Sequence, residues 1–158
     1  MLRARPTEPD PSTLRPQRVL LASEGREITQ AAVTFAATLA RQGDGKVHVF
    51  SVARVWGTSL GFPNPGLLPS RREWDQQRAV VEHAVNALKK RGVEAEGHVL
   101  ATRKATKRIV GEAERLGCDV IVMAADPSRS QLVGDFMWSQ EPQRVKRRAR
   151  VPVYLVES

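Results

Sequence analysis

Short apolar runs alternate along this chain with segments whose apolar residues recur every three or four positions. A short apolar run is typical of a buried strand, and a spacing of three or four is typical of one helix face. Strands are therefore predicted at 18–23, 47–52, 120–123 and 151–156, with a more exposed strand at 93–100. Helices are predicted at 28–39, 74–88 and 109–116, and a last helix starts near Ser139.

Strands and helices follow one another in turn, which predicts an α/β fold with a parallel sheet and helices on both faces. Residues 17–158 form one doubly wound, Rossmann-like domain in this prediction. Residues 1–16 contain four prolines and little apolar surface, so we expect a disordered tail there. The segment Arg54–Ser70 is rich in glycine and proline and is expected to be a long loop, with Ser70 capping the helix that follows.

Composition narrows the classes of protein. The 158 residues are 41% hydrophobic and 27% charged, as in ordinary globular domains, and the formal net charge is +8. A single cysteine, Cys118, excludes an intrachain disulfide and a multi-cysteine zinc site, and it is expected at a helix-to-strand turn. The longest apolar run, Val120–Ala125, is far shorter than the roughly 20 residues of a membrane span. We therefore expect a cytoplasmic protein without membrane contact.

In open α/β sheets, ligands bind beyond the carboxyl ends of the strands where the strand order reverses. That place is predicted between the first and fourth strands, beside the start of the last helix. A helix N-terminus favours an anion there, although Ser139 can also be read simply as a cap. The candidate ligand-binding residues are Ser23, Glu24, Gly25, Met123, Ala124, Ala125, Asp126, Arg129, Ser139 and Gln140.

Three segments carry a resemblance to a known family: LLASEG at 20–25, DVIVMAAD at 119–126 and SQEPQRVKRRARVPVYLV at 139–156. On these segments the chain resembles the universal stress protein family over Gln17–Glu157. The resemblance implies a five-stranded parallel sheet of strand order 3-2-1-4-5 and a homodimer. Some members of the family bind ATP or related adenine nucleotides with a glycine motif, and others lack the motif and do not.

This sequence departs from that motif. Ala124 and Pro127 stand where the resemblance implies glycines, and Ser139-Gln140 stands at its Gly-Ser step. Alanine resists the positive φ that a phosphate cradle often requires, and proline removes a donor. Glu24 and Asp126 add negative charge, which Arg129 offsets in part. We therefore expect weak or absent triphosphate binding, whereas an adenine or ribose contact at Glu24 and Ala124 could survive.

The sequence thus predicts a non-catalytic regulatory binding module of the stress response, with a degenerate adenine-nucleotide pocket and no certain cofactor. One alternative is a functional binder of ATP, AMP or cyclic AMP, or a slow ATPase with Asp126 as its metal carboxylate. Another is a polyanion binder that uses the basic residues at 103–108 and 144–150, which are more simply interpreted as solvated helix faces. A nucleic-acid partner is not expected.

Two further expectations concern assembly and metals. The apolar last strand, Val151–Val156, would be a sheet edge, and two copies are expected to pair along it as a homodimer. The three histidines, His48, His83 and His98, lie on different predicted elements and are expected to be structural, so no metal site is predicted.

Overall fold

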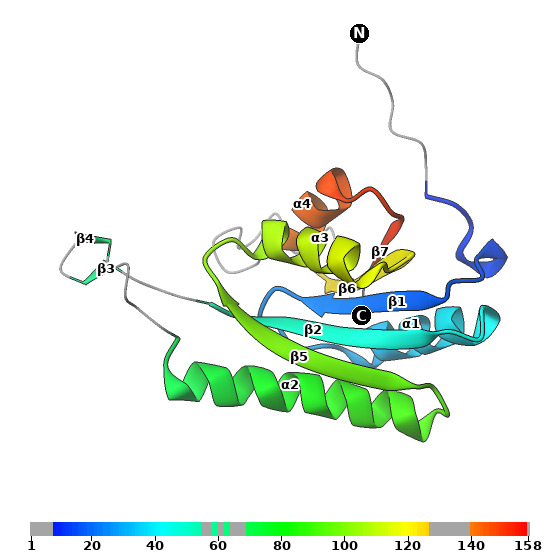
Figure 1. Ribbon diagram of the computed structural model, residues 1–158, viewed down its shortest axis with the longest axis horizontal. Coiled ribbons are helices and arrows are strands. Elements are labelled where there is room, and N and C mark those ends of the chain that lie inside the picture. The colour runs from blue at the N-terminus through cyan, green and yellow to red at the C-terminus, as the bar shows by residue number, and fades with distance from the viewer. Residues whose placement is uncertain (1–7, 55–57, 60–61, 64–68, 127–139, 158) are drawn as a thin grey trace, which may run out of the picture.

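A five-stranded parallel sheet forms the centre of the computed structural model, which describes residues 8–54, 58–59, 62–63, 69–126 and 140–157. The strands lie in the order β5-β2-β1-β6-β7 (Figure 1). Without the two short strands described below, this is the order 3-2-1-4-5, so the predicted topology is confirmed. Their bounds are β1 (Arg18–Ser23), β2 (Lys46–Arg54), β5 (Ala95–Thr102), β6 (Val120–Ala125) and β7 (Val153–Glu157).

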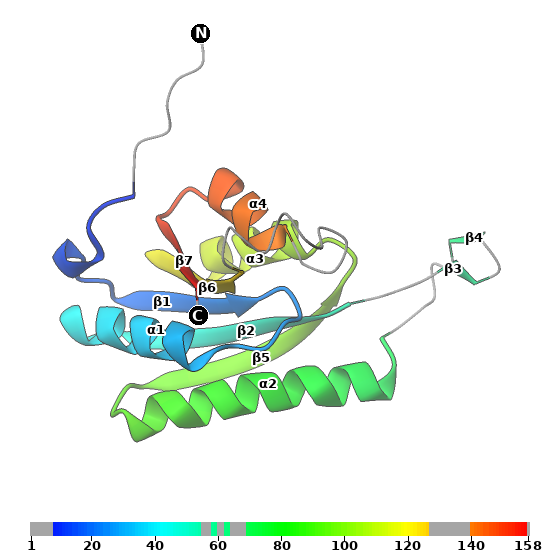
Figure 2. The same cartoon turned by 180° about the vertical axis from the view of Figure 1, so that it is seen from behind.

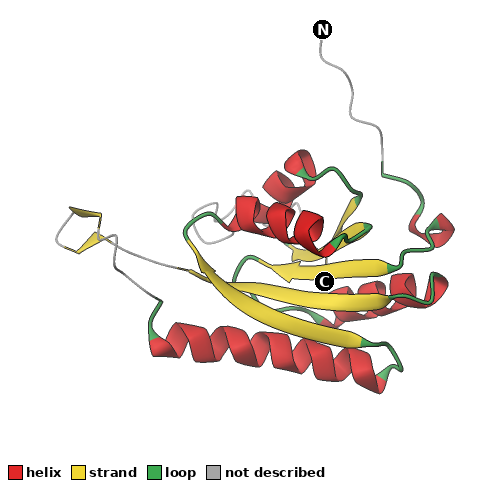
Figure 3. Cartoon of the chain, in the orientation of Figure 1, coloured by secondary structure: helices red, strands yellow, loops and turns green. Residues whose placement is uncertain are grey.

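Helices cover both faces of the sheet, as the alternating pattern predicts (Figures 1 and 2). Colouring by secondary structure separates the central strands from the helical layers (Figure 3). One face carries α1 (Gln30–Gln42) and α2 (Arg71–Lys90), and the other carries α3 (Ala105–Leu116) and α4 (Glu141–Arg148). Within the segment expected to be a long loop, β3 (Thr58–Ser59) and β4 (Phe62–Pro63) pair as a short antiparallel ladder.

The two faces of the sheet build separate hydrophobic cores. On β1, Leu21 packs with α1 and α2, whereas Leu20 packs with α3 and α4. Both side chains are fully buried, since successive residues of a strand point to opposite faces. The same burial on both faces explains why the central strands read as continuous apolar runs rather than alternating ones.

Local signals fix the helix ends. Thr29 Oγ1 accepts a hydrogen bond from Ala32 N at the start of α1, and Ser70 Oγ accepts one from Glu73 N at the start of α2. The predicted Ser70 cap is thus confirmed. Ile28, expected on the first helix, instead precedes it as a buried residue. Gly117 ends α3 with φ +65°, a conformation that favours glycine.

Residues 8–16 are ordered, so the expectation of a disordered tail is wrong for this part of 1–16. A 3-10 turn, η1 (Pro11–Thr13), packs beside the end of α1. The Gln42 amide donates to the carbonyls of Pro11 and Leu14, each at 2.9 Å. The Tyr154 hydroxyl of β7 donates to the Pro9 carbonyl. The polar composition of the segment hid these contacts, because they use its backbone oxygens rather than its side chains.

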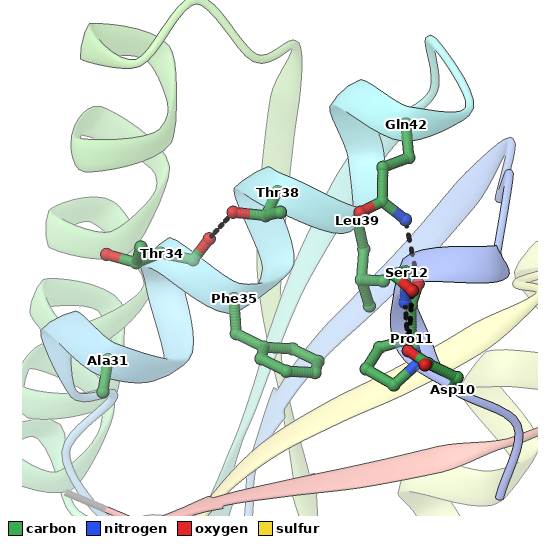
Figure 4. Close-up of a pocket in the computed structure, with 9 residues that line it drawn as sticks. All are labelled: Asp10, Pro11, Ser12, Ala31, Thr34, Phe35, Thr38, Leu39 and Gln42. Atoms are coloured by element: carbon green, nitrogen blue, oxygen red, sulfur yellow. Dashed lines mark hydrogen bonds between the residues drawn. The ribbon is translucent and has the colours of Figure 1, made fainter.

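The η1 turn and α1 border a mainly apolar groove of about 540 Å³, in which Phe35 lies between the two elements (Figure 4). The Phe35 ring also contacts the ring of Tyr154, with 5.5 Å between centroids. The groove therefore lies between the N-terminal segment and α1, and Phe35 connects it to the edge strand β7.

A close approach of α2 to β5 gives a stability test. A Cβ at Gly97 would lie 2.4 Å from Val81 Cγ1 and 2.9 Å from Val49 O, so we expect Gly97→Ala to destabilise the fold by about 1–3 kcal/mol through overpacking. The matched control is Gly111→Ala on α3, where nothing lies within 4 Å of the added methyl. That change should stabilise by up to about 1 kcal/mol, since alanine is the better helix former. Urea unfolding measures both, and equal effects would contradict the packing account.

Candidate functional site

The carboxyl ends of β1 and β6 lie side by side. The two strands pair in parallel, with Ala22 opposite Met123, and the chain leaves the sheet after Ser23 and after Ala125. On the other side of β1, Ser23 pairs with Ser51 of β2. The sheet order reverses here, because β1 connects towards β2 while its other neighbour, β6, comes from later in the chain. The structure thus brings the predicted segments 23–25 and 124–126 together at the switch point.

A tight turn follows β1. Ser23 Oγ accepts a hydrogen bond from Gly25 N at 3.0 Å and donates to the Arg26 carbonyl. Gly25 has φ +120°, which side-chain-bearing residues rarely adopt, although the space around it would admit a methyl group. Glycine is required at this position by the backbone conformation rather than by crowding.

The Glu24 carboxylate is buried in this turn, with only 2% of the residue exposed. Its Oε1 accepts a hydrogen bond from Arg26 Nε, whereas its Oε2 has no hydrogen-bond partner in the described part of the chain. Burial raises the pKa of Glu24 above its ordinary value of 4.5, and the nearby guanidinium groups of Arg26 and Arg54 offset only part of that rise.

Arg26 connects the two strand ends. Its Nε donates a hydrogen bond to Glu24 Oε1, and its Nη1 lies 3.1 Å from Asp126 Oδ2, an ion-pair contact whose geometry does not make a hydrogen bond. Asp126 directly follows β6, so one guanidinium bridges a carboxylate from each chain reversal. The predicted residues Glu24 and Asp126 are therefore close in space, and a positive side chain of the protein itself lies between them.

Three residues that the sequence analysis missed hold this turn from the side of β2. The Arg54 Nε donates to the Glu24 carbonyl at 2.8 Å. The buried Gln77 amide donates to the Gly25 carbonyl at 3.0 Å, and its Oε1 accepts from Ser51 Oγ at 2.6 Å. The sequence did contain a sign of the role of Gln77. It is a polar residue on the apolar face of α2, four residues before the buried Val81, and a buried polar side chain requires a hydrogen-bond partner.

Most other predicted residues do not present free side chains. Met123 is fully buried in the core, and Ala124 and Ala125 are also buried, so they can reach a ligand only through backbone atoms. Arg129 and Ser139 lie outside the described residues. The last helix begins at Glu141, and its N-cap is Gln140, whose side chain makes no capping hydrogen bond.

The start of α4 already has an anion of its own. The Glu141 carboxylate, in the first turn, accepts a hydrogen bond from Thr106 Oγ1 of α3 and lies 3.5 Å from Arg144. The positive end of a helix dipole favours such a carboxylate. The anion site predicted there would therefore place a phosphate beside an existing negative charge.

Other candidate groups have structural roles. His98 Nε2 lies 2.9 Å from Glu112 Oε2, and His48 Nδ1 lies 3.2 Å from Glu96 Oε1. Cys118 is buried at the turn between α3 and β6, and burial raises the pKa of its thiol to about 11, which disfavours the reactive thiolate. Among the described residues, no cluster of three or more histidine, cysteine or carboxylate side chains could hold a metal ion. None of the described helices has the length and apolar character needed to cross a bilayer.

The sheet order, with its switch point between β1 and β6, defines an α/β protein of the doubly wound class. The model of the Universal stress protein family matches residues 16–157, and the chain belongs to that family. This confirms the resemblance drawn from the sequence. No curated protein matches the sequence.

Solved structures support the fold. A universal stress protein from Archaeoglobus fulgidus in complex with dAMP has a TM-score of 0.65 at 20% identity, over 90% of this chain and 98% of that one. A family member from Burkholderia pseudomallei gives 0.65 at 22% identity, over 90% and 96%. A universal stress protein in complex with cAMP gives 0.64 at 19% identity, over 90% and 98%.

The burial of Glu24 predicts a distinctive pH dependence. Because the folded-state pKa is raised, the native state holds the Glu24 proton more tightly than the unfolded chain does. Ionisation of Glu24 therefore costs stability as the pH rises from about 4.5 through the folded pKa, and Glu24→Gln removes that cost. We expect the variant to gain stability relative to the parent across this interval, as measured by urea unfolding from about pH 4 to pH 8. If the free energy of unfolding of the parent instead rose relative to that of the variant with increasing pH, the raised pKa of Glu24 would be contradicted.

Proposed function

We propose that this protein is a non-catalytic regulatory binding module of the stress response that works in the cytoplasm. Its switch point at the ends of β1 and β6 would bind adenine nucleotides such as ATP, AMP or cyclic AMP weakly or not at all. The observation that carries the proposal is the Arg26 bridge between Glu24 and Asp126, because it fills the switch point with the protein's own charged groups.

Three carboxylates in the segments predicted to bind the phosphate support weak phosphate binding. Glu24 and Asp126 stand at the two strand ends, and Glu141 stands in the first turn of α4. An incoming phosphate would approach these negative charges, and Arg26 compensates for only part of them. The structures with dAMP and cAMP come from other universal stress proteins, so they support an adenine nucleotide as the ligand class to be tested first.

The same bridge argues against a slow ATPase. A magnesium-dependent ATPase needs carboxylate oxygens free to face the metal, and Asp126 was the candidate from the sequence. Its Oδ2 instead lies 3.1 Å from the Arg26 guanidinium. We expect no hydrolysis of ATP above background in the presence of magnesium.

Restoring the two glycines tests the nucleotide proposal. We expect the parent protein to bind ATP with a Kd weaker than about 10 µM, and the double variant Ala124→Gly/Pro127→Gly to bind at least about tenfold more tightly. The reason is that each recovered backbone hydrogen bond to a charged phosphate contributes about 1.5–3 kcal/mol. Isothermal titration calorimetry with ATP, AMP and cyclic AMP measures both.

The matched control places two glycines elsewhere in the same segment, as Ser128→Gly/Ser130→Gly. This variant should give no gain, because added flexibility alone does not restore the motif. A submicromolar Kd for ATP in the parent protein, or an equal gain in the control, would show that the proposal is wrong.

We also propose a homodimer that pairs along β7. Tyr154, Leu155 and Val156 are half-buried on this edge strand, which has β6 as its one neighbour in the described sheet. An apolar sheet edge is a ready template for a second strand.

Val156→Lys should therefore convert the dimer to a monomer at about 20 µM, as measured by sedimentation. Val80→Lys, at another half-buried valine on α2, is the control and should leave the dimer intact. A parent protein that sediments as a monomer at this concentration would contradict the proposal.

A further inference from the structure

The two basic segments at 103–108 and 144–150, which the sequence alone favours as solvated helix faces, belong to adjacent helices. Helices α3 and α4 pack against one another on the same face of the sheet (Figures 1 and 2). Ile109 of α3 and Val145 of α4 share one hydrophobic core, and the Thr106–Glu141 hydrogen bond joins the starts of the two helices. Their remaining faces therefore form one continuous outer surface, called here the α3–α4 face (residues 103–117 and 140–150).

The α3–α4 face is strongly basic. At the start of α3, the exposed residues include Arg103, Lys104, Lys107 and Arg108. From α4 and its end come a further five exposed basic residues: Arg144, Lys146, Arg147, Arg148 and Arg150. With Arg115, this surface holds ten basic residues against three carboxylates.

By number, the three carboxylates of this surface can offset only part of its positive charge. Glu112 is buried, and its oxygens bond Arg115 and His98. Glu141 is also mostly buried, with a side chain 16% exposed. Only Glu114 is exposed, and it lies 3.9 Å from Arg150. On the opposite layer, α2 has five basic residues against the three carboxylates Glu73, Asp75 and Glu82, so most of the excess positive charge lies on the α3–α4 face.

We propose that the α3–α4 face binds double-stranded nucleic acid through its backbone phosphates, without sequence preference. This is separate from the switch point and does not depend on nucleotide binding there. At 1.5 Å per residue, the 12 and 8 residues of the two helices extend about 18 and 12 Å, whereas a duplex carries one charge per about 1.7 Å of its axis. Several phosphates can therefore contact flexible lysine and arginine side chains at once.

The composition of the surface favours a duplex over other polyanions. Neither α3 nor α4 contains an aromatic residue, so these helices offer single-stranded bases no side chain for stacking. Neither helix fully exposes a large apolar side chain, so insertion into an anionic bilayer has no anchor.

Fluorescence anisotropy with a labelled duplex of about 25 base pairs and arbitrary sequence tests the proposal. We expect binding at about 50 mM salt that weakens by about 10²–10³-fold at 200 mM, as neutralising about four to six phosphates requires. The double variant Arg147→Glu/Arg148→Glu should bind at least about tenfold more weakly than the parent and show a shallower salt dependence.

The control, Lys89→Glu/Lys90→Glu, makes the same change of charge in the last turn of α2, on the other face of the sheet. This control variant should bind the duplex less than about threefold more weakly than the parent. At about 50 mM salt, the attraction between the duplex and charges on the far side of the protein is screened over roughly 14 Å. Lys107→Glu/Arg108→Glu on α3 gives a second variant of the face, should the α4 variant fail to fold by circular dichroism.

Three results would overturn the proposal: no duplex binding at about 50 mM salt, equal losses in the face and control variants, or tighter binding to single strands or phosphatidylserine vesicles than to the duplex. The first would show that the charge serves only to keep the face solvated. The second would assign binding to net charge rather than to this surface.

Discussion

A buried carboxylate needs a cation beside it, and Glu24 obtains one from a residue only two positions away. Leaving a charge unpaired in a poorly solvated site costs several kcal/mol, so the ionised form of Glu24 is tolerated in this turn only while Arg26 lies against it. Gly25 supplies the positive φ that allows this short reversal, and Gln77 and Arg54 hold its carbonyl groups from neighbouring elements. The Arg26–Glu24 pairing is thus the charged contact at the centre of this turn.

The same pairing sets the character of the switch point. Because Arg26 also reaches Asp126, the ends of β1 and β6 are joined by a charged bridge at the place where an open α/β sheet offers its ligand site. A ligand there would compete with contacts that the protein makes with itself. This competition is the physical basis of the proposal that the protein binds nucleotides weakly and does not turn them over. The α3–α4 face does not include Arg26, Glu24 or Asp126, so binding there does not disturb the bridge.

The strands and helices could be predicted from the sequence, since parallel strands buried on both faces leave apolar runs and the helices have apolar stripes. The strand order came from the resemblance to the family. The site could be predicted only in part. Glu24 and Asp126 follow strands whose ends must meet, so their proximity was foreseeable. The Arg26 bridge, Gln77 and Arg54 were not, because their roles depend on side-chain reach and on packing between elements far apart in the chain. The order of residues 8–16 was missed for the same reason, since the Gln42 and Tyr154 side chains supply it.

Nitrogen-15 spectra of the arginine side chains, recorded with and without ATP, test the central claim most directly. We expect a sharp, separate Arg26 Nε–H signal that moves in Glu24→Gln and is unchanged by ATP at about 10 µM, because the bridge persists against a weakly bound ligand. An Arg26 signal averaged with those of exposed arginines, or one displaced by ATP at that concentration, would show that the bridge does not govern the switch point.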